Sequence, residues 1–73
     1  MADVGARVLL GVRGMDTPSS RETVEEALRA VGGVRRVEAS SDLQVAVEYD
    51  AAEVTVMDLI RALRRIGFLA GME

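Results

Sequence analysis

The chain has 73 residues without cysteine or histidine, so it offers one small domain neither a disulfide nor a His or Cys metal ligand. Its net charge of −3 argues against nucleic acid, which needs a basic surface. No apolar run approaches the roughly 20 residues that cross a membrane. Hydrophobic residues still make up 49% of the chain, enough for a packed core, and we expect a single domain over residues 1–73.

The N-terminal segment shows no targeting signal. Residues 1–5 lack both the basic region and the apolar region of a secretory signal peptide. The absence of cysteine also fits a reducing compartment. We therefore expect a cytoplasmic protein without membrane insertion.

The chain should begin with a strand, followed by a loop and a helix. Over residues 4–12, apolar and mixed positions alternate with a period of two, which predicts a strand with one buried face. The helix has two candidate starts. Either Thr17 caps it and Pro18 is its first residue, or Ser19 caps it and Glu22 completes a capping box.

This first helix should bury one side and end at a pair of glycines. Its apolar stripe consists of Val24, Ala27, Leu28 and Val31. Gly32-Gly33 offers the left-handed position at which many helices end. Residues 34–40 and 43–49 then alternate as two strands, joined by a tight hairpin at 40–42.

A second amphipathic helix and a short strand complete the pattern. After a connection at 50–54, Thr55 should cap the helix, with Asp58 as its capping-box partner. Its apolar stripe consists of Val56, Leu59, Ile60, Leu63 and Ile66. Gly67 should end the helix, and residues 68–70 predict a last strand.

The predicted element order is β-α-β-β-α-β. Strands with one apolar face and two amphipathic helices fit a two-layer α+β sandwich, with both helices on one face of a four-stranded antiparallel sheet. The ferredoxin-like arrangement is the expected form of this sandwich.

Four dipeptides in this pattern resemble landmarks of the heavy-metal-associated domain family. They are Gly14-Met15 in the first loop, Gly33-Val34 after the first helix, Tyr49-Asp50 at the end of the third strand and Gly67-Phe68 after the second helix. Their order and spacing agree with the family from about Val8 to Ala70. The resemblance implies the ferredoxin-like fold of copper chaperones, mercury-binding proteins and the N-terminal domains of metal-transporting P-type ATPases.

The sequence departs from this family at the metal site. The first loop of the family reads Gly-Met-x-Cys-x-x-Cys, but here the two cysteine positions carry Thr17 and Ser20. Soft ions such as Cu(I) require thiolates, whereas a hydroxyl is a hard ligand that stays protonated near neutral pH. We therefore predict a copper-chaperone-like domain without a thiolate metal site and without a cofactor.

The vestigial loop is the candidate binding surface. Its residues are Met15, Asp16, Thr17, Ser19, Ser20 and Phe68. Thr17 and Ser20 are also typical of helix capping. The free N–H groups of the helix start would attract an anion, although Asp16 would repel it. Asp16 and Glu22 alone would make only a weak site for a hard cation.

Met15 and Phe68 each allow two interpretations. Met15 is either a thioether ligand for Cu(I) or a gap-filler in the core behind the loop, which is the position that the resemblance implies. Phe68, which lies beside the metal loop in the family, is either a residue at the edge of the core or part of a small exposed apolar patch with Met15 and Pro18.

The two helices are predicted to carry opposite charges. The first has Glu22, Glu25 and Glu26, and the second has Arg61, Arg64 and Arg65. These residues are either ordinary solvated surface, with the arginines favoured by the helix dipole, or docking surfaces for a partner or a second copy.

The residues that most enzymes use as bases and nucleophiles are absent, because the chain has no His and no Cys, so we do not expect an enzyme. We interpret the chain as a degenerate heavy-metal-associated domain that serves as a protein-interaction or regulatory module linked to metal transport. Its partner would be another protein or domain, such as a metal-transporting ATPase or a second copy. The alternative is a metal-ion binding or transport domain that uses non-cysteine ligands or ligands of a partner, and a third reading is a structural domain without a ligand.

Overall fold

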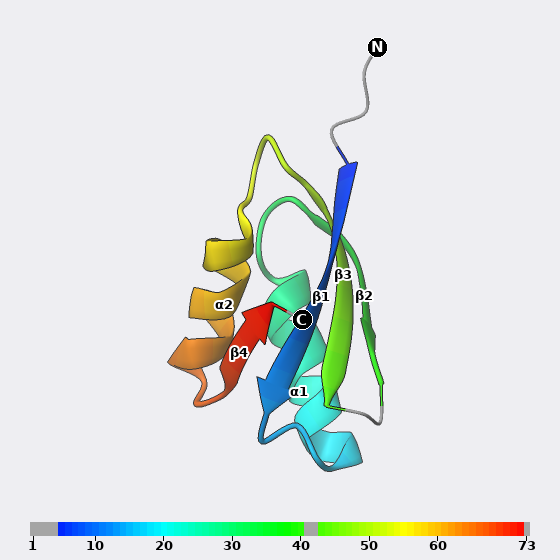
Figure 1. Cartoon of the computed structure of the whole chain (residues 1–73), viewed down its shortest axis with the longest axis vertical. Coiled ribbons are helices and arrows are strands. Elements are labelled where there is room, and N and C mark those ends of the chain that lie inside the picture. The colour runs from blue at the N-terminus through cyan, green and yellow to red at the C-terminus, as the bar shows by residue number, and fades with distance from the viewer. Residues whose placement is uncertain (1–4, 41–42, 73) are drawn as a thin grey trace.

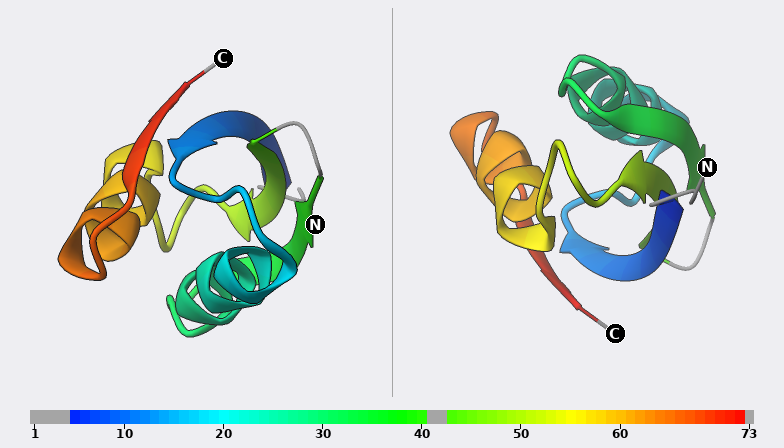
Figure 2. Two further views of the ribbon diagram at one scale, coloured as in Figure 1. Left: turned by 90° about the horizontal axis from the view of Figure 1, so that it is seen from below. Right: turned by 90° about the horizontal axis from the view of Figure 1, so that it is seen from above.

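The alternating and amphipathic segments form six elements within residues 5–40 and 43–72, which the computed structural model describes. They are β1 (Gly5–Arg13), α1 (Pro18–Arg29), β2 (Val34–Ala39), β3 (Gln44–Asp50), α2 (Val56–Arg65) and β4 (Leu69–Met72). The strand order is β2-β3-β1-β4, and each neighbouring pair is antiparallel. Both helices lie on one side of the twisted sheet (Figure 1, Figure 2). The predicted ferredoxin-like α+β sandwich is therefore confirmed.

The alternation of apolar and mixed residues along the strands decides which face of the sheet the helices cover. In β1, the side chains of Val8, Leu10 and Val12 are buried, whereas Leu9 is 43% exposed on the opposite face. The helices close the core from one side with Val24, Leu28, Leu59 and Leu63, all of them buried. The apolar stripes predicted for both helices thus face the sheet, except for Ile66, which is 43% exposed.

The first helix starts at the earlier of its two candidate positions. Thr17 is its N-cap, Pro18 its first residue and Ser20 its N3 residue, so the alternative start at Ser19 with Glu22 is wrong. Proline at the first helical position loses no intrahelical hydrogen bond and already has a helical φ, which favours this start.

The end of α1 lies before the predicted glycine pair. The helix ends at Arg29, and its C-cap Ala30 keeps a right-handed backbone (φ −73°). The left-handed residue is Gly33 (φ 95°), in the turn that leads into β2. A Cβ atom on Gly33 would lie 2.9 Å from the Cβ of Glu53. Gly33 is therefore needed for the close approach of this turn to the chain after β3, and it does not cap the helix.

The second helix follows the prediction closely. Thr55 caps it, and Asp58 completes the capping box. At its C-terminal end, the N–H of Gly67 donates to Arg64 O (3.1 Å) and the N–H of Phe68 donates to Leu63 O (3.0 Å). This is the Schellman pattern, and it requires the left-handed backbone that Gly67 adopts (φ 93°). The predicted helix stop is confirmed.

Each strand has at least one boundary that shifts by one or two residues, and β1 and β3 each end one residue later than predicted, at Arg13 and Asp50. β4 is Leu69–Met72, not 68–70, because Phe68 still belongs to the hydrogen bonds that close α2. β3 begins at Gln44, not at 43, because Leu43 has a left-handed backbone (φ 59°) that does not fit a strand. β2 ends at Ala39, one residue before the predicted end.

Parts of two predicted segments lie outside the described residues. They are Val4, the first residue of the predicted first strand, and Ser41-Asp42 in the predicted hairpin. On either side of the hairpin, the N–H of Ser40 donates to Gln44 O (2.8 Å), so β2 and β3 do pair up to its base.

Candidate functional site

The loop between β1 and α1 lies at one end of the molecule. In Figure 1 this is the lower end, where the end of β2, the start of β3 and the α2–β4 turn also lie. The N–H of Val12 donates to the carbonyl oxygen of Leu43 (2.7 Å), which ties the β2–β3 turn to the end of β1. On the other side, a Cβ on Gly14 would meet the Phe68 ring at 3.4 Å. The loop is therefore framed by Leu43 and Phe68.

Thr17 and Ser20 bond to each other and to the start of α1. The Ser20 N–H donates to Thr17 Oγ1 (3.1 Å), and the Thr17 N–H donates to Ser20 Oγ (3.0 Å). The two hydroxyl oxygens are 2.9 Å apart, and Ser20 Oγ also donates to the Thr17 carbonyl (2.9 Å). The two positions that resemble the metal-binding pair of the family thus form a reciprocal capping box.

This capping box changes what the loop can do chemically. Each hydroxyl oxygen already accepts a hydrogen bond from a backbone N–H that would otherwise lack a partner at the helix start. Recruiting either oxygen to an ion would sacrifice that hydrogen bond, and a neutral hydroxyl offers a soft ion little in return. The geometry stabilises α1 and does not favour a soft metal.

The other predicted site residues separate into buried and exposed groups. Met15 is fully buried (0% exposed), so its sulfur packs in the core and is not offered to solvent as a ligand. Phe68 is half-buried against the core, and Asp16 and Ser19 are exposed. The structure therefore brings Thr17 to Ser20 and Phe68 to the loop, while Met15 faces inward.

No carboxylate site for a metal forms within residues 5–40 and 43–72. This part of the chain contains no group of three or more Asp or Glu residues close enough to share an ion. Asp16 and Glu22, weighed as a weak pair from the sequence, therefore gain no third carboxylate.

Exposed apolar side chains around the loop were not anticipated from the sequence. Leu43 is 40% exposed, Ile66 43% and Leu69 58%, and all three belong to turns or strand ends next to the loop. Leu69 is paired with Arg13 at the end of β1. Ile66 was predicted to lie in the buried stripe of α2, but it is the C-cap residue and is largely exposed. These three exposed residues become apparent only from the solvent exposure in the fold.

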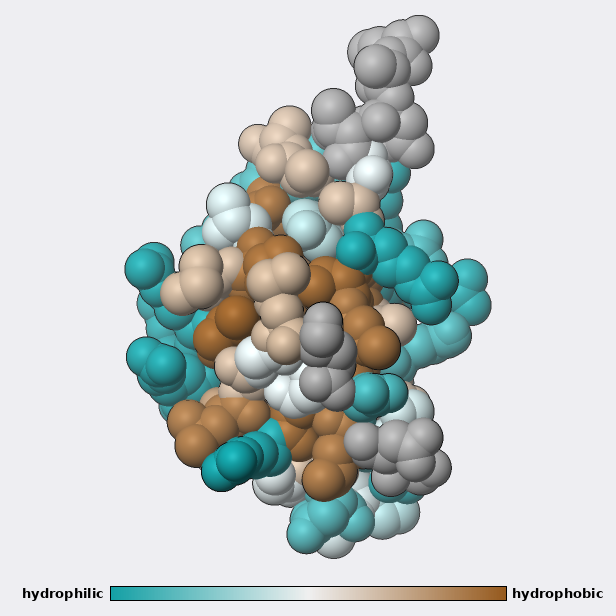
Figure 3. Space-filling model, viewed as in Figure 1, coloured by the Kyte–Doolittle hydropathy of each residue, from teal (hydrophilic) through white to brown (hydrophobic). Residues whose placement is uncertain are grey.

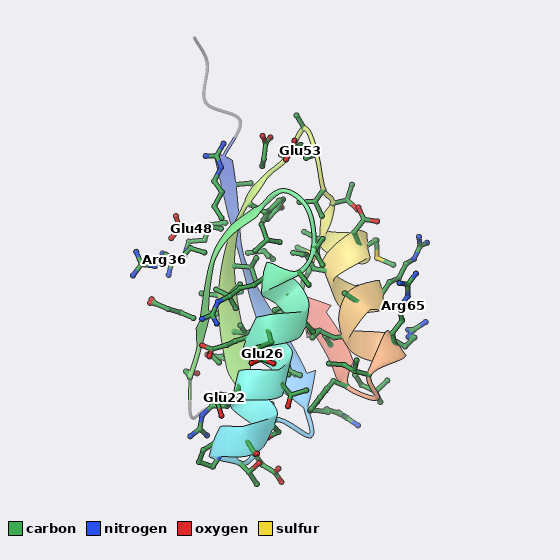
Figure 4. The ribbon with its side chains drawn as sticks, turned by 180° about the vertical axis from the view of Figure 1, so that it is seen from behind. Glu22, Glu26, Arg36, Glu48, Glu53 and Arg65 are labelled. Atoms are coloured by element: carbon green, nitrogen blue, oxygen red, sulfur yellow. The ribbon has the colours of Figure 1, made fainter. Side chains whose placement is uncertain are left out.

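The charged helix surfaces point in different directions. Figure 4 shows Glu22 and Glu26 on α1 and Arg65 on the far side of α2, directed away from them. Glu25 is less available, because it pairs with Arg29 (3.9 Å) and accepts the N–H of Ala39 (3.1 Å). The two helices therefore present separate acidic and basic surfaces.

None of the described helices has the length and apolar character that spanning a bilayer requires.

Known structures resemble this fold closely. Oxidized MerP from Ralstonia metallidurans CH34 superposes with a TM-score of 0.91 at 28% identity, covering 94% of this chain and 97% of MerP. The CopZ metallochaperone gives 0.86 at 28% identity, covering 90% of this chain and 100% of CopZ. A copper-binding domain from the P-type ATPase HMA7 gives 0.88 at 26% identity and covers 92% of both chains.

Sequence comparison identifies the family. No curated protein matches the chain significantly. The heavy-metal-associated domain family, however, matches residues 9–68, which include β1 from Leu9 onward, the loop, both helices, β2 and β3. The chain is thus related to copper chaperones and to the metal-binding domains of ATPases, and it contains no cysteine. This protein belongs to the heavy-metal-associated domain family.

Proposed function

We propose that this domain is a protein-interaction or regulatory module linked to metal transport, and that it works in the cytoplasm without carrying a metal ion or catalysing a reaction. The observation that carries the proposal is the Thr17–Ser20 capping box, which occupies both hydroxyls at the position of the family's metal pair. The fold and its docking surfaces remain when the ligands are lost. Without a metal ligand, the loop end binds another protein.

The surface proposed for docking is the exposed part of the loop and its surroundings. It comprises Asp16, Thr17, Ser19, Ser20 and the half-buried ring of Phe68. The partner favoured by the family relationship is the metal-binding domain of a metal-transporting P-type ATPase, since an ATPase domain is among the similar structures. The single domain over residues 1–73 would dock as one unit.

The metal part of the proposal is tested by titrating the ¹⁵N-labelled chain with Cu(I), and then with Zn(II), under anaerobic conditions. We expect no saturable shift of the amide signals from Gly14 to Arg21 or of Phe68. Localised, saturating shifts there would support the alternative, a metal site made from non-cysteine ligands, and would overturn the proposal.

The docking part is tested by titrating the same labelled chain with the metal-free metal-binding domain of a copper-translocating P-type ATPase from the same genome. Shifts should concentrate at the loop, and Asp16→Asn should weaken them. Glu53→Gln is the matched control, because Glu53 is an exposed acid at the opposite end of the molecule (Figure 4). Equal effects of the two substitutions, or no shifts at all, would reject docking through the loop.

A further inference from the structure

A hollow lies between the α1–β2 turn and α2, apart from the loop described above. It has a volume of about 330 Å³, which is at the lower end of the range for small-molecule pockets. Its lining residues come from the turn after α1, the connection before α2 and one side of α2: Val31, Gly32, Glu53, Val54, Asp58, Arg61, Ala62 and Arg65. The candidate site in the loop uses none of them.

The apolar part of the hollow is partly sheltered from solvent. Val54 is buried (3% exposed), and Val31 and Ala62 are half-buried. Gly32 has no side chain to fill the space, and a Cβ there would meet nothing within 4 Å. The hollow therefore has room for an aliphatic group of a ligand.

The charged residues of the hollow are arranged by sign along α2. Glu53 and Asp58 lie toward the N-terminal end of this helix, and Arg61 and Arg65 follow toward its C-terminal end. Figure 4 shows Glu53 beyond the start of α2 and Arg65 near its last turn. In Figure 3, hydrophilic surface follows the margin of the molecule where α2 lies. The hollow thus has a negative end and a positive end.

Three of these four charges have no ion-pair partner in the described part of the chain. Glu53, Arg61 and Arg65 form no salt bridge with another residue of 5–40 or 43–72. Asp58 differs, because its carboxylate accepts hydrogen bonds from the N–H and the hydroxyl of Thr55. Glu53 is therefore the carboxylate that a ligand can reach at the negative end.

A ligand with a single charge suits only one end of this hollow. The arginines would attract an anion, but the two carboxylates would repel it, and for a metal cation the signs are reversed. A zwitterion satisfies both ends. Side chains on a helix tilt toward its N-terminus, which brings the guanidinium groups of Arg61 and Arg65 back toward the carboxylates.

The spacing of the charges decides the size of the zwitterion. Along the helix axis, Arg61 and Arg65 lie about 5 and about 11 Å beyond Asp58. A free α-amino acid is too short for this span, because one Cα carries both of its charged groups. A dipeptide has two Cα atoms about 3.8 Å apart, with a charged group beyond each of them.

We infer that the hollow binds a zwitterionic peptide of dipeptide size, with its ammonium group at Glu53 and its carboxylate at Arg61 and Arg65. An aliphatic side chain of the peptide lies against Val31 and Val54. This inference goes beyond the proposed function, because the hollow is separate from the loop and its ligand is a small molecule.

The first test varies the ligand. Titration of the ¹⁵N-labelled chain with L-alanyl-L-leucine should give saturable amide shifts at residues 31–33 and 53–65, with a Kd on the order of 1 mM for a ligand this small. The N-acetylated dipeptide lacks the ammonium group, and the C-terminal amide lacks the carboxylate. Both, and free L-leucine, should bind roughly fivefold more weakly or worse, because a charge-assisted contact is lost. Equal binding by any of them, or no saturable shift with the dipeptide, would overturn the inference.

The second test varies the protein and uses the same dipeptide. Arg65→Gln should weaken binding by roughly fivefold or more. Arg64→Gln is the matched control, because Arg64 is an equally charged, exposed neighbour on α2 that does not line the hollow, and it should leave the Kd unchanged. Equal losses in the two variants would mean that only the net charge matters, and the site would be wrong.

A third variant fills the hollow without removing a charge. Gly32→Leu places a side chain in open space at a residue without a positive φ, so it should block the dipeptide while the Tm stays near that of the wild type. Unchanged binding in this variant would also overturn the inference. The loop signals of residues 14–21 should not move in any of these titrations, so a failure here leaves the proposed function standing.

Discussion

Gly33 and Gly67 share a left-handed backbone but differ in their surroundings. A Cβ on Gly33 would lie 2.9 Å from Glu53 Cβ and 3.1 Å from Val54 Cγ1, whereas a Cβ on Gly67 would meet nothing within 4 Å. Gly67→Ala should therefore cost only the backbone penalty of about 1 kcal/mol. Gly33→Ala should cost about 3 kcal/mol, because steric crowding adds to that penalty. Urea unfolding of both variants checks this difference, and equal losses would mean that the turn relaxes without penalty.

Leu43 is the opposite case, because it carries a large side chain at a position whose left-handed backbone favours glycine. If its left-handed conformation is strained, Leu43→Asn should raise the free energy of unfolding by about 1 kcal/mol. The gain should appear as a higher Tm in thermal unfolding. A loss of stability would show that the leucine side chain contributes packing that outweighs the strain.

The helices carry capping boxes of different chemistry. In α2 the backbone N–H of Thr55 donates to the Asp58 carboxylate (2.9 Å), and the Thr55 hydroxyl donates to it as well (3.0 Å). These two hydrogen bonds, aided by the charge of Arg61, lower the pKa of Asp58 below its ordinary 3.8. In α1 the corresponding partner is Ser20, which does not ionise in this range.

This difference predicts a pH dependence for α2 alone. Because the pKa of Asp58 is lower in the folded state, its stabilisation is present above 3.8 and is lost as pH falls through the folded pKa. Asp58→Asn should therefore destabilise the domain at neutral pH, and its difference from the wild type should shrink in acid. Ser20→Ala should destabilise by a similar amount at both pH values. Parallel pH profiles for the two variants would contradict this assignment.

At the scale of elements, the sequence was most informative where local chemistry decides the structure. Thr55, Asp58 and Gly67 define both ends of α2 by short-range hydrogen bonds, and both ends were predicted. The end of α1 was misplaced because Gly33 is needed for a tertiary contact with Glu53, which no local pattern reveals. The backbone of Leu43 was missed for a related reason, since its sequence does not favour the left-handed region.

In the candidate site, too, features set by local chemistry could be predicted, whereas features set by tertiary contacts could not. The capping role of Thr17 could be weighed from residue chemistry and the core position of Met15 from the family resemblance, and the structure supports both. The exposed apolar residues beside the loop could not be predicted, because Leu43 lies before β3 and Ile66 and Leu69 flank the α2–β4 turn, and these two segments, distant in sequence, reach the same end only in the folded sheet. Exposure of Ile66 contradicted its place in the helical stripe, since the helix ends one residue before it.

At the scale of the whole molecule, the central question is whether a metal ion stabilises the fold. A ligand present at about 1,000 times its Kd stabilises a protein by about 4 kcal/mol, which for a domain this small raises the Tm by more than about 15 °C. We expect no such shift when Cu(I) is added to the wild-type chain under anaerobic conditions.

The matched variant restores the ligand pair that the family resemblance places at positions 17 and 20. The double variant Thr17→Cys with Ser20→Cys should lose some stability without metal, because both capping hydroxyls are removed. It should then gain a large Tm shift with Cu(I), whereas Thr17→Cys alone should gain much less, because one thiolate holds a soft ion weakly. A missing shift in the double variant would mean that these positions do not match the ligand pair. A large shift in the wild type would show that other residues bind the ion, and the docking proposal would then give way to a metal-binding one.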